Sequence, residues 1–136
     1  MFKYNYYVDL TVAELLQKVG WMIYTPNQYI LNSSTGNYEL MDLGLEQCAI
    51  VEAAGRNVIY MPTYEQAYNF IREYDPGWFI SITYDKEYNA HQFKVYYLGT
   101  NEKFQNYIYD QPVCPDMSYK RSYLYALEHI LHRIIN

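Results

Sequence analysis

The chain has 136 residues, of which 51% are hydrophobic, and it carries a formal net charge of −5 at pH 7. This composition predicts one folded domain over residues 1–136 and excludes an intrinsically disordered chain. The negative charge argues against direct nucleic-acid binding, because such binding depends largely on neutralising phosphates. The chain has no apolar run of about 18 residues and no apolar signal core at its N-terminus. We therefore expect a cytoplasmic protein with no membrane partner.

The first part of the chain predicts one helix followed by short strands. Residues 2–10 are aromatic and are compatible with an edge strand or an arm. Thr11 and Glu14 match a capping box, which predicts the start of a short helix, and Gly20 lies where helices commonly end. Strands are predicted, from their composition and the turn residues around them, at residues 21–24, 28–31, 38–41, 47–52 and 58–61.

Two of these predicted strands pair with each other, and one is ambiguous. Residues 28–31 and 38–41 are separated by a polar loop, so we expect them to form a hairpin. Residues 47–52 are compatible with a strand or a turn of helix. We prefer the strand, because residues 53–57 have the composition of a turn into the next strand.

A capping box at Thr63 and Gln66 predicts a helix in the middle of the chain. Apolar residues then recur at three- and four-residue steps, which places them on one helix face. Pro76 and Gly77 are expected to end this helix. The residue before a proline is disfavoured in a helix, and glycine tolerates positive φ angles.

The last part of the chain predicts a hairpin, a loop and a long helix. Residues 78–84 are aromatic and β-branched, and they are expected to pair with residues 91–98, which begin with polar and apolar residues in alternation. Residues 99–117 are mostly polar and carry two prolines, so we interpret them as an extended loop. Ser118 is expected to cap a final helix over residues 119–135.

Together these elements predict an α+β fold with a single domain. The hairpins favour a mostly antiparallel sheet of about five to seven strands, packed against about three helices. The sequence has no repeat of fixed period and no linker that would divide it.

Two histidines are the only candidates for a metal site. His129 and His132 lie three residues apart on the predicted last helix, and Glu128 lies beside them. Zinc sites need more ligands than this, and basic residues near a helix C-terminus are also explained by the helix dipole. We therefore predict no metal and no cofactor.

The sequence also gives little support for a catalytic cysteine. Cys48 and His91 would have to meet in the fold, because the nucleophile must be a thiolate beside a base. The apolar neighbours of Cys48 instead favour a buried, inert thiol, and Cys114 is likewise expected to be a free, buried thiol. The glycines form no phosphate-binding loop. We predict no catalytic residue.

An acidic segment and many tyrosines favour binding over catalysis. No Lys or Arg occurs between Lys18 and Arg56, and the chain has 19 tyrosines. The acidic segment is either a solvated face or a negative patch that meets a basic partner, and tyrosines of the predicted hairpin loop would extend it. The predicted partner-binding residues are Glu39, Asp42, Glu46, Glu52, Tyr84, Asp85, Glu87 and Tyr88.

A small, acidic, tyrosine-rich chain of this kind resembles in character the anti-CRISPR proteins of phages and mobile elements. The resemblance rests on the acidic segment from Glu39 to Glu52 and on the aromatic segment from Tyr60 to Tyr84, and it involves no shared motif. It implies a protein partner, a CRISPR effector nuclease, which reads and holds DNA with basic residues. The residues that would occupy those basic groups are Glu39, Asp42, Glu46 and Glu52, with Tyr84 and Tyr88 packed beside them.

Several alternatives remain open from the sequence. An immunity protein that neutralises a toxin has the same acidity and small size. A small cysteine- or histidine-dependent enzyme, and an accessory domain with no inhibitory role, are further options. A homodimer is also compatible with the exposed strand edges and the surplus aromatic residues.

Overall fold

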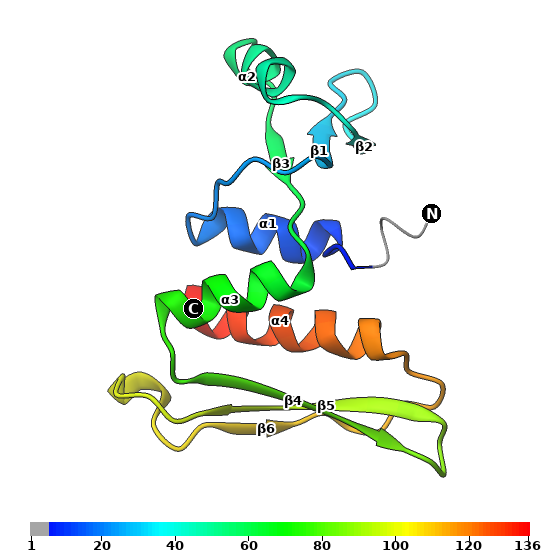
Figure 1. Cartoon of the computed structure of the whole chain (residues 1–136), viewed down its shortest axis with the longest axis vertical. Helices are drawn as coiled ribbons and strands as arrows, with labels where there is room; N and C mark the ends of the chain where they lie inside the picture. The colour runs from blue at the N-terminus through cyan, green and yellow to red at the C-terminus, as the bar shows by residue number, and fades with distance from the viewer. Residues whose placement is uncertain (1–5) are drawn as a thin grey trace.

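Two three-stranded antiparallel sheets lie at opposite ends of the molecule, with three helices between them (Figure 1). The computed structural model describes residues 6–136. The elements in chain order are α1 (Leu10–Lys18), β1 (Gln28–Leu31), β2 (Tyr38–Met41), α2 (Leu45–Ala53), β3 (Val58–Tyr60), α3 (Tyr64–Tyr74), β4 (Trp78–Asp85), β5 (Ala90–Tyr97), the 3-10 helix η2 (Glu102–Phe104), β6 (Ile108–Asp110) and α4 (Tyr119–Ile135).

The first sheet has the strand order β2-β1-β3. Strands β1 and β2 form the predicted hairpin, in which Gln28 pairs with Met41 and Leu31 with Tyr38. The fully buried Gln28 also fixes the chain that leads into α2. Its Nε2 donates to the carbonyl of Leu43 at 3.1 Å, and its Oε1 accepts from the Leu43 amide at 3.1 Å.

The second sheet has the strand order β4-β5-β6, and helix α4 packs on one of its faces. The β4–β5 hairpin runs in register from the Trp78–Tyr97 pair to the Asp85–Ala90 pair. Trp78 and Tyr97 are both buried, and their rings lie 5.0 Å apart. Alternation along the strands therefore directs one set of side chains toward α4 and the other set away from it.

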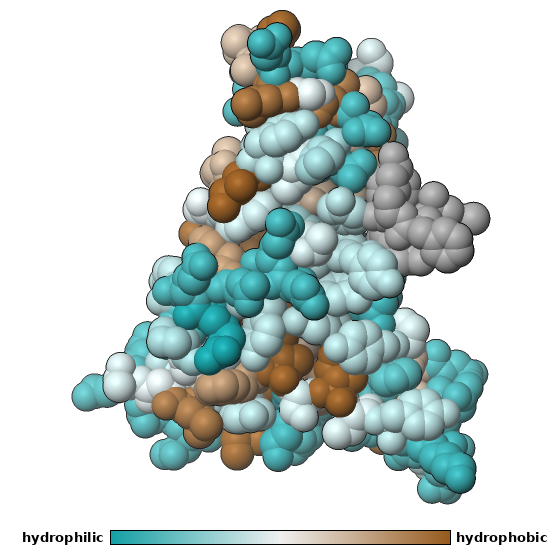
Figure 2. Space-filling view, in the orientation of Figure 1, coloured by the Kyte–Doolittle hydropathy of each residue, from teal (hydrophilic) through white to brown (hydrophobic). Residues whose placement is uncertain are grey.

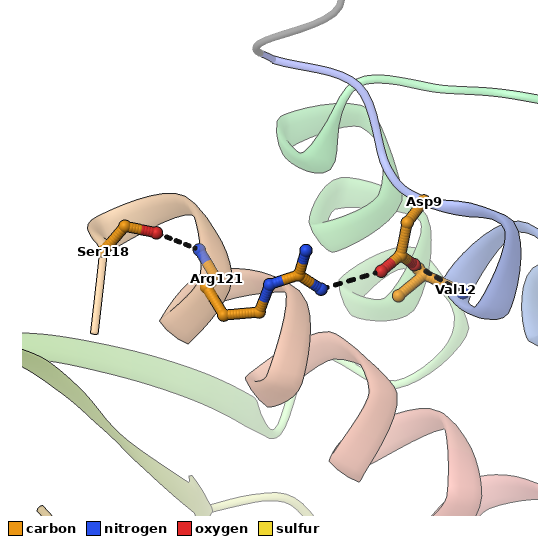
Figure 3. Close-up of polar contacts among 4 residues, drawn as sticks. All are labelled: Asp9, Val12, Ser118 and Arg121. Atoms are coloured by element: carbon orange, nitrogen blue, oxygen red, sulfur yellow. Dashed lines mark hydrogen bonds and ion pairs between the residues drawn. The ribbon is translucent and has the colours of Figure 1, made fainter. Parts of the chain in front are cut away.

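A layer of helices α1, α3 and α4 separates the two sheets (Figure 1). Ser118 caps α4, as predicted, by accepting a hydrogen bond from the Arg121 amide at 3.0 Å. Asp9 caps α1 by accepting from the Val12 amide, and its second carboxylate oxygen lies 3.1 Å from Arg121 Nη1 (Figure 3). One continuous apolar core extends through this layer and into both sheets.

The α+β class and the antiparallel pairing are confirmed. The capping box of Thr63 and Gln66 is present at the start of α3, and the predicted 78–84 and 91–98 strands pair as β4 and β5. The strands of residues 6–136 form two small sheets, however, and not one larger sheet.

The prediction of a strand at residues 47–52 is wrong, because this segment forms most of helix α2. Gly44 is the N-cap residue, and its amide donates to the side chain of Gln47 at 3.0 Å. A glycine N-cap is a weak signal in a sequence, because it offers no side-chain acceptor. The start of this helix was therefore not visible in the composition.

Three other predictions need correction. The cap of α1 is Asp9 and not Thr11. Residues 21–24 run through the structure without strand pairing, whereas the predicted loop 99–117 contains η2 and the edge strand β6. Residues 2–5 of the aromatic segment 2–10 lie outside the described residues, and in the remainder Tyr7 forms an isolated bridge with Thr63. Within residues 6–136, no helix combines the length and apolar character needed to cross a membrane.

Candidate functional site

Helix α2 leaves most of its apolar side chains in solvent. Of its nine residues only Cys48 is buried, whereas Leu45 is 61% exposed and Ile50 is 69% exposed. A helix of a soluble domain normally turns its apolar side chains toward a core. The apolar and polar residues mixed at this end of the molecule are visible as brown and teal atoms at the top of Figure 2. Exposed apolar groups of this kind mark a candidate contact surface.

The four predicted acids of the first part of the chain all lie on this same end. Residues 28–60, which comprise β1, β2, α2 and β3, are here called the acidic lobe. Glu39 belongs to β2, Asp42 follows it, and Glu46 and Glu52 belong to α2; all four are exposed. The fold therefore brings together the acids that the sequence placed in one segment.

The acidic lobe carries a single basic residue, Arg56, and with its four carboxylates its formal charge is −3. The guanidinium of Arg56 donates to the carbonyl oxygen of Leu31 from Nε at 3.1 Å and from Nη2 at 2.9 Å. This contact holds the positive charge beside β1. Because the four carboxylates are exposed, the lobe presents a negative potential to a partner.

Glu39 and Glu52 also connect parts of the lobe through hydrogen bonds. Glu39 accepts a hydrogen bond from Asn32 Nδ2 at 2.6 Å, which links β2 to the loop before it. Glu52 accepts one from the hydroxyl of Tyr60 at 2.5 Å, which ties α2 to β3. Burial and this hydrogen bond raise the pKa of Tyr60, and burial together with the charge of Glu52 raises the pKa of the Cys48 thiol.

The hairpin residues that were expected to extend the acidic patch lie elsewhere, so that part of the prediction is wrong. Tyr84, Asp85, Glu87 and Tyr88 lie at the β4–β5 turn, at the opposite end of the long axis from α2 (Figure 1). The helix layer separates the two groups. Asp85 shapes the turn, because its Oδ1 accepts from the amides of Glu87 and Tyr88 at 2.9 and 3.2 Å.

The histidines and cysteines do not assemble a site of the kinds considered from the sequence. Cys48 lies in helix α2, which contacts β3 of the first sheet, whereas His91 lies in β5 of the second sheet. In the part of the chain that the structure describes, no three His, Cys, Asp or Glu side chains are grouped so that they could hold a metal ion. Cys114 is exposed and not buried, because it lies in the surface segment between β6 and α4.

A shallow hollow of about 410 Å³ lies beside α4, and nothing in the sequence indicated it. Its floor is aromatic: the ring of His129 stacks on Tyr109 at 4.1 Å and contacts the hydroxyl of Tyr107. Burial, together with the charges of Arg133 and His132, lowers the pKa of His129. His129 therefore acts as a packing residue between α4 and the second sheet.

Comparisons with protein-family models, with curated proteins and with solved structures found no match for this chain. Functional inference consequently rests on the surface itself. The exposed apolar residues Leu45 and Ile50 were missed from the sequence, because residues 47–52 were interpreted as a strand and Leu45 lies in the unassigned segment before it.

Proposed function

We propose that this protein is a non-enzymatic, cytoplasmic inhibitor of the anti-CRISPR type. In this proposal the acidic lobe occupies basic DNA-binding residues of a CRISPR effector nuclease and thereby excludes DNA. The observation that carries the proposal is helix α2, which exposes the apolar residues Leu45 and Ile50 on the same helix as the acids Glu46 and Glu52. The wider resemblance to anti-CRISPR proteins supplies the class of partner.

The chemistry of the lobe suits a basic protein surface. Carboxylates steer association with arginine and lysine side chains, and exposed apolar residues supply anchors that lose water on contact. An effector nuclease offers such a surface, because it reads a short DNA flag with arginines and holds DNA in a positive channel. The hydrogen bonds of Glu39 and Glu52 hold two of the carboxylates in place before the partner arrives.

Neutralising the four acids tests the proposal. The variant with Glu39→Gln, Asp42→Asn, Glu46→Gln and Glu52→Gln keeps the side-chain shapes and can still accept the hydrogen bonds from Asn32 and Tyr60. We expect it to bind a purified effector nuclease at least about tenfold more weakly, because its long-range attraction is lost. Binding and DNA cleavage should be measured at low and at moderate salt, since screening weakens charge-driven association.

A matched control neutralises four exposed acids that lie outside the acidic lobe: Glu65, Glu73, Glu87 and Glu102. It changes the net charge by the same amount and should inhibit like the wild type. A second variant, with Leu45→Gln and Ile50→Gln, removes the apolar anchors and keeps helix-forming residues. Undiminished inhibition by the acid-neutralised variant would rule out the acidic mechanism. Capture of a small toxin in place of a nuclease would favour the immunity-protein alternative.

A further inference from the structure

The second sheet has a face that no element of residues 6–136 covers. Figure 1 shows α3 and α4 on one side of the β4–β5–β6 sheet and open space on the other. The buried residues Phe93, Val95 and Tyr97 alternate along β5 with residues that are not buried. The residues that share the open face by this alternation and by the strand register include Phe79, Ser81, Lys94, Tyr96, Ile108 and Asp110.

These residues form two rows across the strands, one apolar and one charged. In the apolar row, Tyr96 pairs with Ile108 on β6 and stacks on Phe79 of β4 with 5.4 Å between ring centroids. In the charged row, Lys94 of β5 pairs with Asp110 of β6. The open face therefore has an exposed apolar row directly beside a positive and a negative charge.

A hollow of about 460 Å³ lies on the same part of the sheet, and its lining includes Ser81, Tyr96, Leu98 and Ile108. Leu98 is 73% exposed and Ile108 is 61% exposed. Both side chains therefore project from the rim of the hollow into solvent. A surface with apolar projections beside an apolar hollow can accept the same projections from another molecule.

We propose that this face binds a second copy of the chain about a two-fold axis that runs parallel to the strands, between β5 and β6. Rotation about this axis places β5 of each copy opposite β6 of the other copy. It sets Lys94 against Asp110 of the second copy, and Tyr96 against Ile108 of the second copy. Lys94 and Asp110 are register partners within the sheet, and so are Tyr96 and Ile108. The same axis therefore brings opposite charges together in one row and apolar side chains together in the other.

The charges of the face favour a second copy over other occupants. Lys94 and Asp110 cancel within the charged row, and the guanidinium of Arg72 on α3 already lies over the Phe79 ring, with 4.6 Å between Arg72 Cζ and the ring centroid. The two rows themselves therefore carry no excess charge that would attract a strongly basic or acidic partner. Stacked aromatic rings on a sheet can also bind single-stranded nucleic acid, but such platforms lie in positive grooves. Asp110 in line with Lys94 makes this face a poor match for a phosphate backbone. A dimer about a two-fold axis needs a surface that is complementary to itself, and the charged and apolar rows provide one.

The dimer is expected to be weak. Strand β6 spans only three residues, so the area that two copies can bury about this axis is small. Interfaces at the low end of the size range are typically transient. We expect a dissociation constant in the micromolar range or weaker, on the order of 10–100 µM.

Reversing the charge of Lys94 or of Asp110 tests the proposed dimer. Self-association is measured by sedimentation velocity from about 10 µM to about 1 mM protein. The wild type should show dimers at the upper concentrations. Lys94→Asp and Asp110→Lys should each weaken self-association at least tenfold, since each brings like charges together across the axis. An equimolar mixture of the two variants should restore dimers, because each chain then meets the opposite charge.

Two controls keep the result interpretable. Lys86→Asp changes the charge at the hairpin turn and should dimerise like the wild type, and thermal unfolding should show that every variant is folded. Ile108→Gln should weaken the dimer without a change of charge. The proposal is overturned by a wild type that stays monomeric throughout, by single variants that dimerise normally, or by a mixture that fails to associate. Binding of a labelled single-stranded oligonucleotide to this face would also overturn it.

Discussion

At the scale of single residues, tyrosine hydroxyls connect elements that are distant in the sequence. The hydroxyl of Tyr97 donates to Asp75 Oδ2 at 2.7 Å and accepts from the Asn101 amide at 2.9 Å. The hydroxyl of Tyr68 on α3 accepts from the Ile80 amide on β4 at 3.0 Å. Part of the high tyrosine content is thus structural, since these rings pack into the core and their hydroxyls hold polar groups at its edge.

Buried tyrosines make stability depend on alkaline pH. Burial raises the pKa of Tyr123, so the folded protein holds this phenol proton more tightly than the unfolded chain does. Its contribution to stability is complete below the unfolded pKa of about 10 and is lost as the pH rises above that value. We expect Tyr123→Phe to unfold less readily than the wild type near pH 11 in thermal melts, with little difference at pH 7. Tyr88→Phe, which removes an exposed hydroxyl at the hairpin turn, serves as the control variant.

The two cysteines should differ sharply in reactivity. Cys114 is exposed, whereas Cys48 is buried and its thiol pKa is raised by burial and by Glu52. Only the thiolate reacts readily with a disulfide reagent. We expect one thiol to react quickly in the native protein and the second only after denaturant is added. Cys114→Ser should abolish the fast phase and Cys48→Ser should not; a fast reaction of Cys48 would show that α2 opens readily.

At the scale of elements, the junction between α3 and β4 has no room for a side chain at Gly77. A Cβ atom on Gly77 would lie 2.4 Å from the amide nitrogen of Gly99 and 2.6 Å from a ring carbon of Tyr97. The carbonyl of Gly77 also accepts from the Leu98 amide at 2.8 Å. The backbone after α3 therefore packs directly against the backbone after β5, and glycine is required there for lack of space.

Adding a methyl group at this junction should destabilise the protein. We expect Gly77→Ala to lower the free energy of unfolding by about 2 kcal/mol or more, because backbone atoms cannot move aside easily. Gly44→Ala is a matched control, since its nearest neighbour would be Gln47 Oε1 at 3.8 Å. Urea unfolding measures both. Equal stability of the two variants would contradict the tight packing of Gly77.

Elements with a local chemical signal were predictable from the sequence, and elements without one were not. Side-chain caps at Thr63 and Ser118 identified α3 and α4, and strand composition identified β4 and β5. Helix α2 was missed because its N-cap residue is a glycine and because only one of its nine residues is buried. A helix that lacks a buried face has little periodicity to detect.

At the scale of the whole molecule, the division into two sheets decides which predicted site residues meet. The four acids of the acidic lobe are close in the sequence, so their common location could be inferred. Whether the β4–β5 turn joins them depends on long-range packing, and the helix layer places that turn at the far end of the molecule (Figure 1). Contacts between distant segments are set by the assembled core, which composition and periodicity do not reveal.

The packing of α1 on α4 has a consequence for how the protein is made. Asp9 and Arg121 are bonded across a separation of 112 residues, and the two helices share the core. At about 5–20 residues per second, α1 leaves the ribosome on the order of ten seconds before α4 can reach it. During that interval Val12 and Leu16, both fully buried in the finished fold, lack their partner. We therefore expect the nascent chain to present the apolar side chains of α1 to chaperones until α4 emerges.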